Sequence, residues 1–141
     1  VLNGVNLNML GQRDPAQYGT LTLTELETQV YAWAAERSLT ARCFQTNHEG
    51  AFVDHIHECR GWASGVIINP GAWTHYAYAI RDALEIVAVP KVEVHLSDIA
   101  AREEWRRHSV IADVVDHSIS GRGAEGYRDA LDWLREAIAS A

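Results

Sequence analysis

An arginine and a tyrosine stand five residues apart in a stretch that favours neither a helix nor a strand. The segment 6–19 reads NLNMLGQRDPAQYG and contains Arg13, the turn signal Asp14-Pro15, and Tyr18. A free tyrosine has a pKa near ~10, so a tyrosine base near neutral pH needs a cation that stabilises its phenolate. Arginine keeps its own proton and can therefore stabilise a phenolate without neutralising it. This spacing predicts a loop that folds a guanidinium and a phenol over one bound molecule for proton abstraction.

The elements that must position this pair are short β-branched runs that alternate with helical patterns. The predicted strands cover 1–5, 40–45, 65–69, 91–96 and 113–119, and the predicted helices cover 22–37, 49–62, 74–87, 101–106 and 124–139. A capping box at Thr22 and Glu25 begins the first helix, and the third helix is expected to bury Tyr76, Ile80 and Leu84. Residues 1–141 are thus expected to form one three-layer, doubly wound α/β domain. Its five-stranded parallel sheet would have the flavodoxin-like order 2-1-3-4-5, with helices on both faces.

Polar residues follow several of these strands, where ligands bind in such folds. They are Asn6 after the first strand, Asn69-Pro70-Gly71 and His75 after the third, and His95-Leu96-Ser97, Arg102 and Arg106 after the fourth. Each piece alone also has an ordinary explanation: a strand exit, a hydrogen-bonded structural histidine, a packing aromatic or, for 101–109, a solvated charged turn. Their joint placement at one sheet edge favours a binding site.

Several other chemistries lack their signatures. His55 and His57 are two residues apart, so on a helix they point to different faces and make a poor metal pair. No GxGxxG opens the first strand–helix turn, no GxSxG elbow occurs, and the GRGAEG run at 121–126 follows the last strand. The single lysine, Lys91, lies at the start of a strand, away from the expected site, which argues against Schiff-base chemistry. The remaining Tyr, His, Arg and Asn side chains suit proton transfer and elimination with no metal and no cofactor.

Composition sets further limits on partners and compartment. The net charge of −7 and the pI of about 5.4 argue against a nucleic-acid surface. No apolar run reaches the ~20 residues of a membrane span, so no membrane partner is expected. Cys43 and Cys59 show no disulfide framework, which fits a reducing cytoplasm.

The ordered blocks NGVNLNMLGQRDPAQYG, QTNHEGAFVDHIHE, NPGAWTHYAYAIRDAL, EVHLSDIAAREEWRRHS and GRGAEGY span nearly all of the chain. In these blocks the sequence resembles type II 3-dehydroquinate dehydratase (3-dehydroquinase). The resemblance implies a cytoplasmic enzyme with a flavodoxin-like fold that assembles as a homododecamer built from trimers. Such an enzyme converts 3-dehydroquinate to 3-dehydroshikimate by anti elimination of water through an enolate, with no metal and no imine.

The resemblance also implies a role for each matching residue. Tyr18 would take the proton at C2, Arg13 would hold Tyr18 as the phenolate, and His95 would protonate the departing C1 hydroxyl with Glu93 tuning it. Asn6 would position the water at the enolate oxygen. Asn69 and the backbone amides of Leu96 and Ser97 would bind the substrate carboxylate. His75 and Arg106 would bind ring hydroxyls, and Asp82 would reach the site of a neighbouring subunit.

Two positions depart from the family pattern. Val5 stands where the family has proline, which could loosen the approach to Asn6. Asp98 replaces the usual asparagine, and an acid near a carboxylate site could weaken the binding of an anion. Two alternatives therefore stay open: a non-catalytic flavodoxin-like binding module, and a slow relative that binds dehydroquinate-like acids.

Overall fold

Five parallel strands form one sheet in the order β2-β1-β3-β4-β5 in the computed structural model, which describes residues 1–141. The strands are β1 (Leu2–Asn3), β2 (Phe44–Gln45), β3 (Val66–Asn69), β4 (Lys91–His95) and β5 (His117–Ser120). All four neighbouring pairs are parallel. This topology confirms the predicted flavodoxin-like sheet order.

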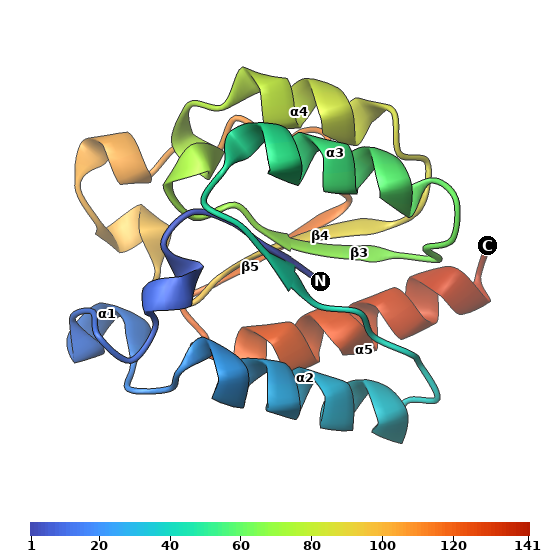
Figure 1. The fold of residues 1–141 in the computed structure, drawn as a ribbon, viewed down its shortest axis with the longest axis horizontal. Coiled ribbons are helices and arrows are strands. Elements are labelled where there is room, and N and C mark those ends of the chain that lie inside the picture. Colours follow the sequence, from blue (N-terminus) through green and yellow to red (C-terminus); the bar gives the residue numbers. More distant parts are fainter.

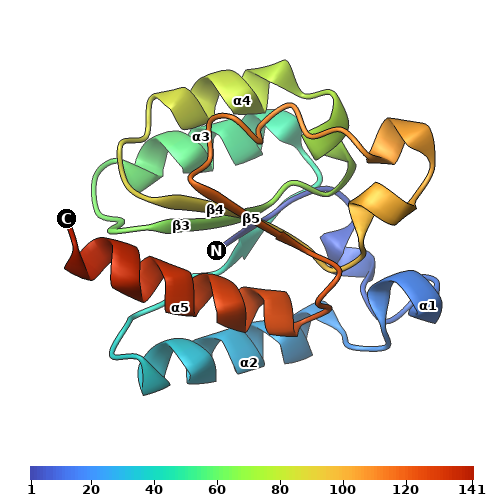
Figure 2. The same ribbon diagram turned by 180° about the vertical axis from the view of Figure 1, so that it is seen from behind.

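Helices cover both faces of the sheet. The α-helices are α1 (Pro15–Tyr18), α2 (Leu23–Glu36), α3 (Glu49–Cys59), α4 (Tyr78–Glu85) and α5 (Glu125–Ala139). Figure 1 shows α3 and α4 on one face of the sheet and α2 and α5 on the other, and Figure 2 shows the same three layers from behind. No helix combines the length and the apolar character that crossing a membrane would take.

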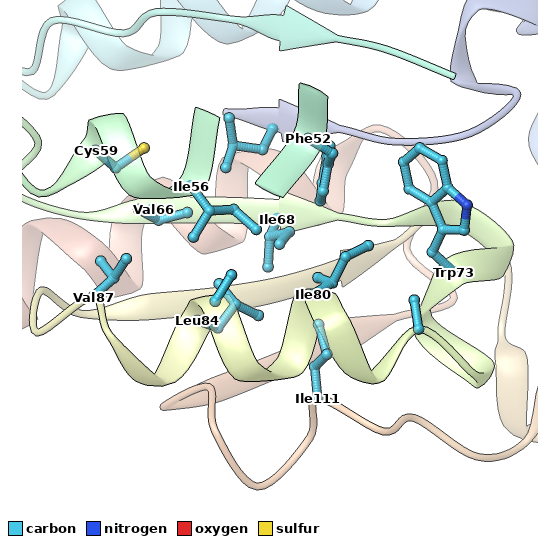
Figure 3. Close-up of a cluster of buried hydrophobic side chains, with 13 residues drawn as sticks. Phe52, Ile56, Cys59, Val66, Ile68, Trp73, Ile80, Leu84, Val87 and Ile111 are labelled. Atoms are coloured by element: carbon cyan, nitrogen blue, oxygen red, sulfur yellow. The ribbon is translucent and has the colours of Figure 1, made fainter. Parts of the chain in front are cut away.

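Each face of the sheet has its own apolar core, because side chains alternate along a strand. On the α3/α4 face, Phe52 and Ile56 of α3 and Ile80 of α4 pack with Ile68 of β3. Figure 3 shows these side chains pointing toward one another, with Trp73 at one end of the cluster. On the α2/α5 face, the partners include Leu26, Val30, Val92, Val94, Tyr127 and Leu131.

The alternation on β4 matters for the site. Val92 and Val94 belong to the α2/α5 core, so Lys91, Glu93 and His95 turn toward the other face. All three are buried. Lys91 Nζ donates to the carbonyl oxygens of Val87 and Val89 at the start of the strand. Glu93 and His95 lie further along the strand, toward its carboxyl end.

The expected helix over 74–87 is interrupted, and this corrects the prediction. Residues Gly71–His75 form a 3₁₀ helix, η2, and α4 begins only at Tyr78. The Thr74 carbonyl accepts from Val110 N at 2.8 Å, so it does not join the helical ladder. The break turns Tyr76 outward: its exposed fraction is 59%, whereas a buried position was predicted.

Other elements also differ from the sequence prediction, and the second strand, predicted over 40–45, covers only Phe44–Gln45. The expected helix over 101–106 is a pair of 3₁₀ turns, η3 (Ile99–Ala101) and η4 (Glu104–Arg106). The loop after β1 contains another, η1 (Leu7–Met9), and the short helix α1. The last strand begins at His117 rather than at 113, because the amides of Val114 and Val115 bond to the Ile111 carbonyl in a turn.

Candidate active site

A cavity lies at the carboxyl ends of β1, β3 and β4, where the sequence predicted a ligand site. Its wall contains nine of the predicted site residues: Asn6, Arg13, Tyr18, Asn69, His75, His95, Leu96, Ser97 and Arg106. Glu93 lies behind His95, and Asp82 is elsewhere. Residues from three stretches of the chain, 6–18, 69–75 and 95–106, therefore share one cavity, as the parallel sheet requires.

The short capped helix α1 places Tyr18 next to Arg13. Asp14 caps the turn α1 by accepting from Ala16 N at 3.0 Å, and Pro15 occupies its first position. The turn directs Tyr18 back toward Arg13, whose Nη2 donates to Tyr18 Oη at 3.0 Å. The Arg13 guanidinium carbon also lies 3.9 Å from the centre of the Tyr18 ring.

A second arginine, Arg102, approaches the same phenol oxygen. Its Nη1 donates to Tyr18 Oη at 3.0 Å and to Ser97 Oγ at 3.3 Å. Two guanidinium groups thus donate to one oxygen and are placed to stabilise negative charge that develops on it. Sequence reasoning placed Arg102 near the sheet edge but gave it no role, because the partner residue is 84 positions away in the chain.

Across the cavity, His95 is paired with Glu93. The His95 Nε2 and Glu93 Oε1 atoms are 2.7 Å apart. Glu93 is 1% exposed, and its carboxylate also accepts from Thr74 Oγ1 at 2.5 Å and from Ser109 Oγ. Burial alone would raise the pKa of the Glu93 carboxyl, but the hydrogen bonds from His95, Thr74 and Ser109 outweigh it and hold the pKa below its usual value. Glu93 is therefore an anion that fixes Nε2–H on His95 and leaves Nδ1 as the other proton-exchanging nitrogen.

His75 occupies the cavity wall between His95 and Trp105. Its ring centre is 6.5 Å from that of His95 and 5.2 Å from that of Trp105. Its Nδ1 is 2.7 Å from the His108 carbonyl oxygen. A carbonyl only accepts, so Nδ1 carries the proton and Nε2 presents a lone pair. Burial lowers the pKa of His75, although the bond to His108 opposes this, so His75 is neutral near pH 7 and can accept a bond from a ligand hydroxyl.

Asn69 is more strongly tied into the fold than the sequence indicated. Its Oδ1 accepts from Gly71 N at 3.1 Å, and its Nδ2 donates to Tyr127 Oη at 2.9 Å. Tyr127 in turn donates to Asn3 Oδ1 at 2.6 Å, and burial raises the pKa of Tyr127 so that it stays neutral. One Nδ2 hydrogen of Asn69 remains for a ligand.

The backbone after β4 offers two amides to the cavity. The carbonyl oxygens of Leu96 and Ser97 accept from Gly123 N and Gly121 N, each at 3.1 Å. The amide hydrogens of Leu96 and Ser97 form no hydrogen bond with another group of the chain. Free amides at a cavity wall can bind an anion.

Asn6 adopts a left-handed conformation with φ of 67°, which asparagine tolerates better than most residues. Its amide donates to Asn47 Oδ1 at 2.9 Å, and its side chain is exposed at the cavity. A close backbone contact supports this bend, because a Cβ on Gly71 would stand 2.5 Å from the Val5 carbonyl oxygen. Val5 itself packs against the α3/α4 core, so the site accommodates valine at this position.

The Asp98 side chain is bonded within its own loop. Its carboxylate accepts from Ala100 N at 3.1 Å and caps η3. Asp98 lines a second, larger cavity of about 700 Å³, which shares Tyr18 and Arg102 with the first. The cap explains how an acid is tolerated next to Ser97.

Asp82 lies outside the cavity, on α4, beside Tyr78 and Arg81. The sequence predicts one helix over 74–87, in which His75 and Asp82, seven residues apart, would share a face; in the structure they lie on separate helices, η2 and α4, and do not. Arg106 does line the cavity, and its Nε donates to Glu103 at 3.1 Å.

A doubly wound parallel sheet with a tyrosine–arginine cluster facing a histidine–glutamate pair defines an acid–base enzyme of the flavodoxin-like class. The model of the family "Dehydroquinase class II" matches residues 1–135, and the chain belongs to this family. It is 54% identical over 136 residues to a 3-dehydroquinate dehydratase of Thermotoga neapolitana, covering 96% of this chain and 92% of that protein. It is 56% identical over 134 residues to one of Pelobacter propionicus, covering 93% and 89%. A crystal structure of a type II dehydroquinase from Propionibacterium acnes superimposes with a TM-score of 0.93 at 44% identity, covering 96% of this chain and 93% of that one.

Proposed function

We propose that this chain is a type II 3-dehydroquinate dehydratase, which removes water from 3-dehydroquinate to give 3-dehydroshikimate. The observation that carries the proposal is the Tyr18 oxygen held by two guanidinium groups, in the same cavity as a histidine backed by a buried carboxylate. This arrangement provides one base and one acid in a single cavity, which an elimination requires. The family membership and the named relatives support the same activity.

The proposed reaction has two proton transfers. The Tyr18 phenolate takes the proton at C2, and the electrons move into the C3 carbonyl to give an enolate. The enolate then expels the C1 hydroxyl, which leaves as water after His95 supplies a proton. Arg13 and Arg102 stabilise the phenolate before the first step, and Glu93 stabilises the protonated form of His95 before the second.

The other cavity residues would hold the substrate. The free amides of Leu96 and Ser97 and the remaining hydrogen of Asn69 are placed to bind the carboxylate. His75 Nε2 would accept from a ring hydroxyl, and Arg106 would donate to another. The exposed Asn6 side chain would hold the water that donates to the enolate oxygen. No step in this scheme calls for a metal or a cofactor.

We also propose that the site is completed by a second copy of this chain. Asp82 is exposed on α4, and the nearby Tyr76, Tyr78 and Ile86 are 59%, 67% and 51% exposed. Large apolar side chains gathered on one helix and its ends fit a protein contact. A homododecamer built from trimers, as the resemblance implies, would cover them and bring Asp82 to a neighbouring site. The cytoplasm is the proposed compartment, in keeping with the two free thiols.

The test is a cofactor-free assay of the purified protein with 3-dehydroquinate and EDTA, following the absorbance of the enone product. We expect enone formation, and we expect borohydride added with substrate to leave the enzyme active. The absence of enone would contradict the dehydratase assignment. Inactivation by borohydride would indicate an imine intermediate, which the proposed mechanism does not contain.

A further inference from the structure

The Glu93 carboxylate depends on a serine that no sequence pattern singled out. Oε1 of Glu93 lies 2.7 Å from His95 Nε2 and 2.5 Å from Thr74 Oγ1. Oε2 has one partner in the chain, Ser109 Oγ at 2.8 Å. Because a hydroxyl has one hydrogen and Oε1 already has two donors, the Ser109 hydrogen belongs to Oε2. Ser109 is therefore the group that keeps the second oxygen of a buried anion hydrogen-bonded.

The residues on either side of Ser109 contact the loop that carries His75. The His108 carbonyl oxygen accepts from His75 Nδ1 at 2.7 Å, and Val110 N donates to the Thr74 carbonyl at 2.8 Å. Ile111 is fully buried in the α3/α4 core and anchors the segment. Its amide also donates to Ser109 Oγ at 3.3 Å, which orients the hydroxyl toward Glu93.

We infer that Ser109 is a positioning residue for the proposed acid: it holds the Glu93 carboxylate as an anion aligned on His95, while its neighbour His108 fixes the ring nitrogen that His75 offers to substrate. The segment 108–110 thus sets the proton positions on both histidines of the cavity. This inference rests on the proposed function, because it assigns Ser109 to the second proton transfer of that reaction.

The physical argument is the cost of an unpaired oxygen on a buried carboxylate. Burial is the largest influence on Glu93 and favours its neutral form, and the hydrogen bonds outweigh that influence. Without Ser109, Oε2 would lose its hydrogen bond, the carboxylate would be less stable, and a protonated His95 would lose part of its anionic support. The other charged or titratable groups around the pair are Arg13, Tyr18, His75, Arg102 and Arg106 in the cavity wall and Lys91 on the same strand.

The primary test is the variant Ser109→Ala. Loss of a hydrogen bond to a buried charge should lower kcat about 10- to 100-fold, with KM changed less than about threefold because the substrate contacts remain. The alkaline limb of the kcat profile should move to lower pH, since a less stable Glu93 carboxylate would give less support to the acid. Ser109→Thr, which keeps the hydroxyl, should restore most of the rate and the profile. The matched control Ser118→Ala changes an exposed serine on β5 and should behave as the wild type.

A second readout separates this inference from the proposed function. Imidazole nitrogen NMR of the ligand-free protein reports the titration of His95 whether or not 3-dehydroquinate is turned over. We expect the His95 resonances to titrate at lower pH in Ser109→Ala than in the wild type and to return in Ser109→Thr. If Ser109→Ala does not fold, Ser109→Cys retains a weak donor of similar size and should show a smaller shift in the same direction. Unchanged His95 resonances, or a rise in KM with kcat preserved, would overturn the inference even if the wild type is an active dehydratase.

Discussion

At the residue scale, the central feature is a phenol oxygen that receives hydrogen bonds from two cations. Arg13 comes from the same loop as Tyr18, whereas Arg102 comes from the segment after β4. A guanidinium carries its charge throughout the physiological pH range. The two bonds can stabilise negative charge on the Tyr18 oxygen during proton abstraction.

The first prediction concerns Arg102. Replacing Arg102 with Met removes one charge-assisted bond to Tyr18, and we expect kcat to fall about 10- to 100-fold. Arg128→Met is the matched control, because Arg128 is a half-exposed arginine on α5, outside the cavity, and pairs with Glu125. Steady-state kinetics of both variants test the role, and an Arg102→Met enzyme as fast as Arg128→Met would show that one arginine is enough.

The second prediction concerns the buried carboxylate of Glu93. Its pKa in the folded protein is below the unfolded value near ~4.3. The ionised group therefore stabilises the fold above that unfolded value, and this stabilisation is lost as the pH falls through the lower folded pKa. Urea unfolding at about pH 5 and pH 3 should show a loss of free energy of unfolding that is smaller in Glu93→Gln than in the wild type. An equal loss in the two proteins would mean that Glu93 is not anionic in the fold.

At the element scale, the site depends on a helix that breaks. Had η2 and α4 formed one continuous helix, the Thr74 carbonyl would bond within it and Val110 would lose its partner. The break instead ties the segment 108–110 to the loop that carries Thr74 and His75. Core packing also holds η2 in place, because Trp73 of η2 contacts Phe52 of α3 with ring centres 5.3 Å apart.

The third prediction tests the contribution of Phe52 to this packing. Phe52 is fully buried, and Phe52→Ala should reduce the free energy of unfolding by about 3–5 kcal/mol, as aromatic truncation in a core typically does. Thr24→Ala, at an exposed position of α2, should change it by less than about 0.5 kcal/mol. Chemical denaturation measures both. A Phe52→Ala protein as stable as Thr24→Ala would show that Phe52 does not stabilise the packing of α3 and α4 on the sheet.

At the scale of the whole molecule, the proposed site extends beyond one chain. Asp82 is exposed on α4, away from the cavity of its own chain. The fourth prediction is complementation between two defective variants, Tyr18→Phe and Asp82→Ala. Each alone should be impaired, but co-expressed chains should form mixed assemblies in which some sites combine an intact Tyr18 with an intact Asp82 from a neighbour. Light scattering checks that the mixture assembles, and no recovery of activity in an assembled mixture would argue against a shared site.

The sequence predicted the sheet order and most of the cavity because both follow from local patterns. Apolar runs such as 65–69 identify strands, and parallel strands bring their carboxyl ends together. Arg102 and Ser109 had no assigned role because their partners, Tyr18 and Glu93, are distant in the chain. Tyr76 was expected inside because the helical period continues through it, and only a tertiary bond from Val110 breaks the helix there. The roles of the individual site residues stay predictions until kinetics are measured.

The most direct test of the central claim is the turnover number of Tyr18→Phe with 3-dehydroquinate at neutral pH, compared with Tyr31→Phe, which changes a half-exposed tyrosine on α2. The variant keeps the ring and removes only the oxygen that Arg13 and Arg102 contact. Loss of the base should lower kcat at least about 100-fold, with KM within a few-fold of the wild type. A Tyr18→Phe enzyme that turns over as fast as Tyr31→Phe would show that another group removes the proton.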